Sequence, residues 1–127
     1  MSLRGKRVLV IEDDAILLMS LEDSLAEFGC LVEAVAMSLT AALELARDIS
    51  VDVAILDVNL NGELVTPVAE TLAQRGVPFV FATGYNSHIV PSFANRPRLT
   101  KPYSQQQLRE AMLCALDRRE RKAIVDR

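Results

Sequence analysis

The sequence predicts an α/β fold in which helices cover both faces of a doubly wound parallel sheet. Short aliphatic runs alternate along the chain with stretches of helical periodicity. Five strand-like runs occur, and the segments between them suit the crossovers that parallel strands need. The two strongest runs, 8–11 and 53–56, end on carboxylates, and sheets of this type bind ligands beyond the carboxyl ends of their strands. Together these observations predict five β-α units in a flavodoxin-like arrangement.

Strands and helices alternate through the first half of the chain. Residues 7–11 form a strand of aliphatic residues, and leucines at helical spacing predict a helix over about 14–28. A weaker strand over 30–36 leads to a helix that Ser38 caps and that ends near residue 49. The second strong strand covers 52–56.

The third strand is followed by a predicted loop over 59–63, which contains a glycine. A helix over about 66–75 comes next, and Gly76 closes it. Residues 78–82 then predict the fourth strand, and they run directly into Thr83.

The last part of the chain predicts a short or irregular fourth helix. Pro91 and Pro97 shorten any helix within 85–96, and polar residues weaken its periodicity. A short fifth strand over 98–100 follows, and Ser104 caps a final helix that ends near residue 122.

Length and composition predict a single domain over 1–127, since half of the 127 residues are hydrophobic and supply one core. The net charge of −3 argues against a broad nucleic-acid-binding surface. Cys30 and Cys114 fit neither a zinc motif nor a disulfide framework, so we expect buried or half-buried thiols in a reducing cytoplasm. No apolar run approaches the length of a membrane span, and we expect neither a membrane nor a nucleic-acid partner.

Acidic residues follow the first and third strands. In a parallel sheet these strand ends lie at one edge, where clustered carboxylates repel one another and resist desolvation. A hard divalent cation offsets the repulsion, and Mg²⁺ typically takes one or two protein carboxylates with water and phosphate oxygens. We expect Asp13 and Asp57 to be direct Mg²⁺ ligands. The backbone carbonyl of Asn59 can supply a further ligand and Glu12 can join through water, whereas Asp14 suits a helix N-cap.

Asp57 is also a candidate nucleophile, because a carboxylate can attack a phosphoryl group and form an aspartyl phosphate. Lys101 would pair with the phosphoryl oxygens as a point charge, and the Thr83 hydroxyl could donate to the same oxygens. Each residue alone has a simpler explanation: a cap, a solvated lysine or a β-branched residue at a strand end. Their shared position at one sheet edge favours a site.

The chain resembles the receiver domain of two-component response regulators over nearly its whole length. Four motifs, in this order and at these separations, carry the resemblance: Val-Leu-Val-Ile-Glu-Asp-Asp at 8–14, Ile-Leu-Asp at 55–57, Ala-Thr-Gly at 82–84 and Lys-Pro at 101–102.

The resemblance implies a phosphoacceptor signalling domain that is not counted as an enzyme. It implies that Asp57 accepts phosphate from a histidine kinase or a histidine phosphotransfer protein, and that the change passes to a downstream protein. It also implies a Mg²⁺ site at Glu12, Asp13 and Asp57, with Thr83 and Lys101 contacting the phosphoryl group.

Phe-Ala-Thr-Gly-Tyr at 81–85 resembles the receiver subgroup called FATGUY. Two residues depart from the usual receiver pattern. Arg98 stands where most receivers carry an aromatic switch residue, and Asn61 stands where proline is frequent. We therefore expect phosphorylation to act on the segment 85–96, with Tyr85 or His88 as candidate participants.

Three other functions remain open on the residues alone. A Mg²⁺-dependent phosphohydrolase with an aspartyl nucleophile would want a second aspartate where Asn59 stands, because an amide cannot transfer protons as a carboxylate does. A flavin carrier would need a neutral phosphate loop after the first strand, where the acids would repel phosphate. A pseudo-receiver that only binds partners would not need the intact acids, Thr83 and Lys101.

Overall fold

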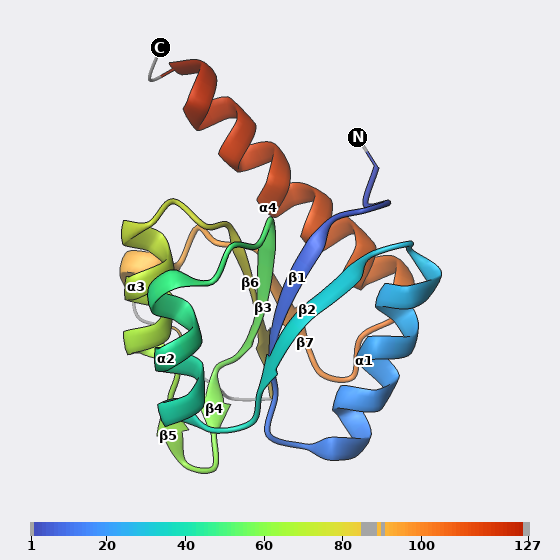
Figure 1. The fold of residues 1–127 in the computed structure, drawn as a ribbon, viewed down its shortest axis with the longest axis vertical. Coiled ribbons are helices and arrows are strands. Elements are labelled where there is room, and N and C mark those ends of the chain that lie inside the picture. Colours follow the sequence, from blue (N-terminus) through green and yellow to red (C-terminus); the bar gives the residue numbers. More distant parts are fainter. Residues whose placement is uncertain (1, 85–88, 90, 126–127) are drawn as a thin grey trace.

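The computed structural model describes residues 2–84, 89 and 91–125, with side chains through residue 118. Within these residues the chain forms a five-stranded parallel sheet in the order β2-β1-β3-β6-β7 (Figure 1). This order confirms the predicted doubly wound α/β fold. The strands are β1 (Arg7–Ile11), β2 (Leu31–Ala36), β3 (Val53–Asp57), β6 (Phe79–Thr83) and β7 (Arg98–Thr100).

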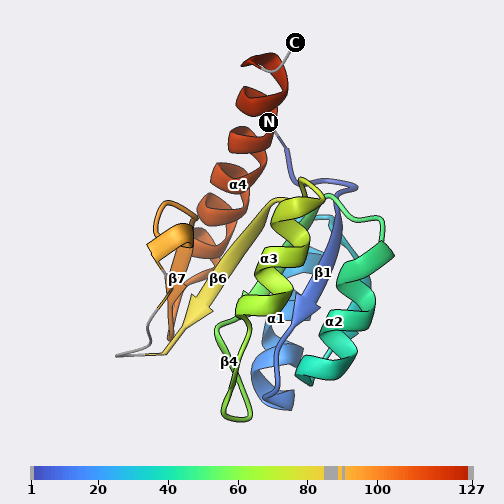
Figure 2. The same ribbon diagram turned by 90° about the vertical axis from the view of Figure 1, so that its left-hand side faces the viewer.

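The four α-helices of the described residues are divided between the two faces of the sheet (Figures 1 and 2). One core packs α1 and α4 against side chains such as Val8 and Val10, and the other packs α2 and α3 against Leu9 and Ile11. Successive residues of β1 thus enter opposite cores, as the pleat of a strand dictates. The helices are α1 (Ala15–Glu27), α2 (Leu39–Asp48), α3 (Thr66–Gln74) and α4 (Gln105–Val125).

The predicted helix caps are present. One Asp14 carboxylate oxygen accepts hydrogen bonds from the backbone N–H groups of Ile16 and Leu17 at the start of α1. Ser104 and Gln107 form a reciprocal capping box at the start of α4, each side chain accepting from the other's backbone N–H. These bonds satisfy N–H groups that have no partner within the helix, so both helices begin where the sequence indicates.

The segment predicted as a loop after β3 is instead a β-hairpin. Its strands are β4 (Asn59–Leu60) and β5 (Glu63–Leu64), and the turn residues Asn61 and Gly62 have φ angles of 53° and 89°. Asn-Gly is the favoured dipeptide for a two-residue hairpin turn in which both central residues have positive φ. The prediction of a loop missed this signal.

In the part of the β6–β7 connection that the structure describes (residues 84, 89 and 91–97), the chain forms a 3₁₀ turn, Pro91–Phe93, and no regular helix. Phe93 is buried in the core that also contains α2 and α3, so the turn covers the sheet where a fourth helix would otherwise lie. Tyr85 and His88 lie outside the described residues. The expectation for the cysteines is half correct, since Cys30 is buried but Cys114 is exposed.

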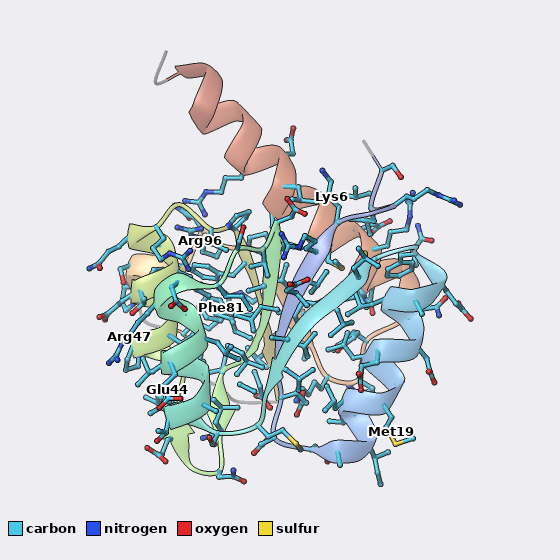
Figure 3. All side chains as sticks on the ribbon, in the orientation of Figure 1. Lys6, Met19, Glu44, Arg47, Phe81 and Arg96 are labelled. Carbon is cyan, nitrogen blue, oxygen red and sulfur yellow. The ribbon has the colours of Figure 1, made fainter. Side chains whose placement is uncertain are left out.

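We expect Phe79→Ala to lower the free energy of unfolding by about 3–5 kcal/mol, the usual cost of emptying a buried aromatic site. Phe79 is fully buried, and its ring lies 5.3 Å from Phe81, 5.7 Å from Phe93 and 4.4 Å from the Arg96 guanidinium carbon. Denaturant titration measures the change. Met19→Ala, on the outward side of α1 (Figure 3), is the matched control and should change stability by less than about 0.5 kcal/mol.

Candidate functional site

The acidic residues meet at the carboxyl end of the sheet. β1 and β3 are adjacent and parallel with Ile11 opposite Leu56, so the next residues, Glu12 and Asp57, come to the same height on neighbouring strands. Ligand oxygens of Glu12, Asp13 and Asp57 all lie within 4.8 Å of one another. Glu12 and Asp57 are buried and Asp13 is partly buried. The fold therefore concentrates three carboxyl groups in a space that water only partly reaches.

Lys101 links the two buried acids. Its Nζ atom donates to Glu12 Oε2 and to Asp57 Oδ2, both at 3.0 Å. Burial alone would lower the pKa of Lys101, but its hydrogen bonds and its attraction to both carboxylates outweigh burial and raise the pKa above its ordinary value. The lysine is therefore a fixed positive charge, and it offsets part of the repulsion between the acids.

Thr83 is buried at the end of β6, next to the strand that carries Asp57. Its hydroxyl donates to the Leu99 carbonyl at 3.4 Å, a long hydrogen bond. The backbone carbonyl of Thr83 accepts from Lys101 N–H at 2.8 Å. Thr83 and Lys101 thus lie side by side at the sheet edge, as predicted, but the threonine hydroxyl bonds to the backbone and not to an acid.

The hairpin leaves the Asn59 carbonyl outside its hydrogen-bond ladder. Val65 N–H donates to the Val58 carbonyl, and paired positions of antiparallel strands alternate between bonded and non-bonded. The next pair, Asn59 with Leu64, is therefore non-bonded. The Asn59 N–H donates to Asp57 Oδ1 at 3.2 Å, which holds this residue beside the acids. The role of the Asn59 carbonyl as a metal ligand stays a prediction.

The burial of Glu12 raises its pKa to about 7. The hydrogen bond from Lys101 opposes this shift, and the neighbouring Asp57 charge adds to it. For Asp13, burial also opposes ionisation, but the hydrogen bond from Asn61 N–H and the neighbouring carboxyl groups outweigh it, so its pKa is lowered. Burial and hydrogen bonding thus shift the pKa values of Glu12 and Asp13 in opposite directions. A divalent cation would find here a donor set of the hard oxygens that Mg²⁺ prefers.

We expect the metal-free protein to lose stability as the pH rises from about 4.5 to 7. The folded pKa of Glu12 lies above its ordinary value of 4.5, so the native state retains a proton that the unfolded chain releases over this window. Glu12→Gln removes the titrating group. Its thermal melting temperature, measured in the presence of a chelator, should therefore depend less on pH over this window than that of the unaltered chain. If the melting temperatures of both proteins depended equally on pH, the raised pKa of Glu12 would be wrong.

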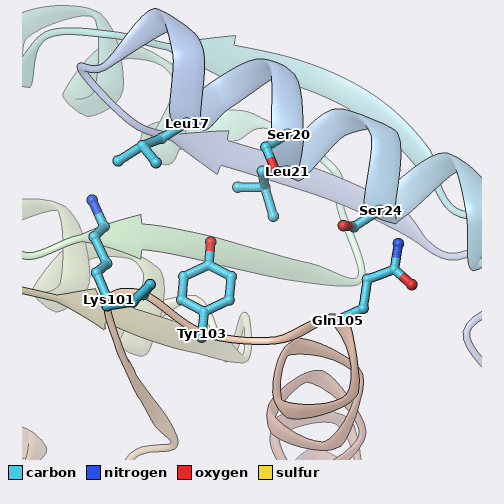
Figure 4. Close-up of a pocket in the computed structure, with 8 residues that line it drawn as sticks. Leu17, Ser20, Leu21, Ser24, Lys101, Tyr103 and Gln105 are labelled. Atoms are coloured by element: carbon cyan, nitrogen blue, oxygen red, sulfur yellow. The ribbon is translucent and has the colours of Figure 1, made fainter.

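Beside the acids, a cavity of about 370 Å³ separates α1 from the segment that follows β7 (Figure 4). Leu17, Ser20 and Leu21 line one wall, and Lys101 and Tyr103 line the other. Leu17 belongs to the leucine repeat that predicts the buried face of α1, yet it is 42% exposed. The repeat alone could not show that Leu17 lies on the rim of this cavity.

Arg98, at the position of the usual aromatic switch residue, is exposed on the edge strand β7. Its guanidinium donates to the Ala94 carbonyl at 3.3 Å, which ties β7 to the residues that follow the 3₁₀ turn. The structure therefore gives Arg98 a contact with the β6–β7 connection rather than with the acids.

A family model for the response regulator receiver domain matches residues 8–113. The solution structure of SdrG from Sphingomonas melonis Fr1 is 40% identical, covers 91% of this chain and 98% of its own, and superposes with a TM-score of 0.78. The PhyR receiver domain of Erythrobacter litoralis is 26% identical, with 90% and 92% coverage and a TM-score of 0.77. A CheY-like receiver domain protein from Methanospirillum hungatei JF-1 is 25% identical, with 93% and 98% coverage and a TM-score of 0.79.

A comparison with curated proteins gave no match. The matches above concern receiver domains in general, so the narrower FATGUY subgroup stays a prediction. Among the described residues, no helix combines the length and the apolar composition needed to cross a bilayer.

Proposed function

Because the chain belongs to the response regulator receiver domain family, we propose that it is a phosphoacceptor whose acceptor is Asp57. Receiver domains are generally signalling domains, and we propose that role here in place of an enzymatic one. The observation that carries the proposal is the Lys101 ammonium, which lies 3.0 Å from carboxylate oxygens of both Asp57 and Glu12. Such a site holds a nucleophilic carboxylate, a fixed cation and further acids that can ligate a metal.

In the proposed reaction, a carboxylate oxygen of Asp57 attacks the phosphorus of a phosphohistidine on a histidine kinase or phosphotransfer protein. A P–O bond forms, the P–N bond breaks, and its electron pair stays on the histidine nitrogen of the donor. Asp13, Asp57 and the Asn59 carbonyl would hold Mg²⁺, with Glu12 through water, and the bound ion would supply positive charge near the transferring group.

Two residues of the chain complete the proposed site. Lys101 would neutralise phosphoryl oxygens as a point charge, and its bond to Glu12 keeps the ammonium at the sheet edge while Asp57 reacts. The Thr83 hydroxyl must leave the Leu99 carbonyl to reach the phosphoryl group. Because that bond is long, its loss would cost little, and the movement would alter the contact between β6 and β7 through which we propose the signal reaches a downstream protein.

A phosphohydrolase is a weaker candidate. The Asn59 side-chain oxygen accepts from Gly62 N–H at 2.7 Å, so an amide engaged in a turn stands where a hydrolase would want a carboxylic acid. We also propose that 1–127 acts as one receiver domain in the cytoplasm, independently of nucleic acid or membrane.

The test is incubation with acetyl phosphate, or with a phosphorylated histidine kinase, followed by intact mass measurement with and without Mg²⁺. We expect a base-labile phosphoryl adduct of one group per chain that requires Mg²⁺. If neither donor gives an adduct, the chain is a pseudo-receiver and the proposal is wrong.

A further inference from the structure

The β4–β5 hairpin is tied directly to one of the acidic residues. Asn61 N–H, at the tip of the hairpin, donates to Asp13 Oδ2 at 2.8 Å. The two residues are 48 positions apart in the sequence, and Asp13 lies beyond the end of a different strand. The hydrogen bond therefore joins the loop after β1 to the segment after β3, at the edge where the carboxylates meet.

The turn that presents this N–H group has a particular geometry. Asn61 and Gly62 both have positive φ, at 53° and 89°, a conformation that glycine and asparagine adopt far more readily than other residues. The side-chain oxygen of Asn59 accepts a hydrogen bond from Gly62 N–H at 2.7 Å, which stabilises the turn. Asn59 thus supports the same turn whose other N–H group holds Asp13.

We propose that Asn59 and Gly62 are positioning residues for Asp13: they hold the hairpin turn so that Asn61 N–H fixes one carboxylate oxygen toward the metal site. This inference rests on the proposed function, because it assigns Asp13 to Mg²⁺. A carboxylate held by a neutral donor keeps its negative charge and loses rotational freedom, so less ordering is needed when a cation binds.

The test uses the full chain and substitutions confined to the hairpin. Gly62→Val places a β-branched residue at a φ of 89°, although a Cβ there meets no atom within 4 Å. The substitution therefore strains the turn without a steric clash. We expect Mg²⁺ affinity, measured by calorimetry, to fall about tenfold, the low end of the range for partners that orient a metal ligand. Asn59→Ala should weaken affinity about threefold.

Two variants distinguish positioning from general damage. Gly62→Asn introduces a residue that tolerates positive φ, so it should recover most of the affinity lost in Gly62→Val. Leu64→Ala alters an exposed residue of β5 that takes no part in the hydrogen bonds of the turn, and it should stay within about twofold of the unaltered chain. Equal loss in Leu64→Ala, or no loss in Gly62→Val, would overturn the proposal.

A second measurement needs no metal. Hydrogen exchange of the Asn61 amide, followed by NMR in the presence of a chelator, should be slowed in the unaltered chain and accelerated about tenfold or more in Asp13→Ala and Gly62→Val. An Asn61 amide that exchanges freely in the metal-free protein overturns the inference and leaves the proposed function standing. If exchange of the Asn61 amide is slowed in a protein that binds no Mg²⁺, the proposed function is wrong, but the hydrogen bond between Asn61 and Asp13 is supported.

Discussion

Asp57→Asn is expected to abolish the phosphoryl adduct that we propose for the unaltered chain. The substitution keeps the shape of the side chain but replaces the carboxylate by an amide, which is not a nucleophile toward phosphorus. It also removes one of the three carboxyl groups that we propose to hold Mg²⁺. Intact mass after incubation with acetyl phosphate and Mg²⁺ measures the effect, and we expect a loss below detection rather than a slower reaction.

The neighbouring acid Asp14 supplies the matched control. Asp14 caps α1 through hydrogen bonds to Ile16 and Leu17, and asparagine caps a helix about as well as aspartate does. Asp14→Asn therefore makes the same chemical change next to the site, and the adduct should remain. An adduct that persists in Asp57→Asn would show that Asp57 is not the acceptor. Equal loss in Asp14→Asn would show that the loss in Asp57→Asn is not specific to Asp57.

Much of the fold could be predicted because its signals are local. The strand predicted over 7–11 matches β1, and the short strand predicted over 98–100 matches β7. A run of strand-forming residues is visible within a few positions. The hairpin β4–β5 was missed although its Asn-Gly turn is a local signal too. Its strands have two residues each, too short for an alternating pattern to be seen.

Exposure was harder to predict than secondary structure. Leu17 and Cys114 both occupy apolar stretches of helices, yet both are exposed. A helix buries only one stripe, and the sequence does not show how wide that stripe is or where the neighbouring segment ends. Leu21 and Leu25, one and two turns further along α1, are buried as the repeat indicates.

The site could be predicted as a set of residues but not as a set of contacts. Parallel topology brings the ends of β1, β3, β6 and β7 to one edge, so motifs at those ends had to meet. Which oxygens Lys101 contacts, and that Thr83 donates to Leu99, depend on side-chain rotamers that no motif encodes. The hydrogen bond from Asn61 to Asp13 is donated by a backbone N–H group, and no residue type in the sequence indicates such a bond.

Lys101→Met should separate the chemical role of the lysine from its structural one. Removing a group that stabilises charge at the reacting centre usually costs about 100-fold or more in rate, so phosphorylation from acetyl phosphate should slow by at least this factor. Mg²⁺ should bind at least as tightly as before, because the competing ammonium is gone while all three acids remain. Intact mass measured on samples quenched at successive times gives the phosphorylation rate, and calorimetry gives the Mg²⁺ affinity.

The same substitution should destabilise the metal-free protein, because it leaves Glu12 and Asp57 buried without a cation. Their side chains are only 3% and 9% exposed, and removing one partner of a buried ion pair typically costs about 3–5 kcal/mol. Loss of the lysine removes the hydrogen bond that lowers the pKa of Glu12, so that pKa rises above about 7. At pH 6 the native variant keeps Glu12 protonated, which relieves the repulsion between Glu12 and Asp57. At pH 8 the unfolded chain has released this proton, so keeping it in the native state costs stability. The destabilisation should therefore be smaller at pH 6 than at pH 8.

Mg²⁺ should reverse this destabilisation if the acids form its site. A cation that binds only the native state stabilises it by mass action, and in Lys101→Met it also takes over the neutralising role of the lost ammonium. We expect thermal melting of the variant at pH 8 to respond to Mg²⁺ more strongly than that of the unaltered chain. Lys101→Arg, which retains a positive charge with a different geometry, should restore metal-free stability more fully than the phosphorylation rate. A Lys101→Met protein that Mg²⁺ does not stabilise would mean that the three carboxylates are not a metal site.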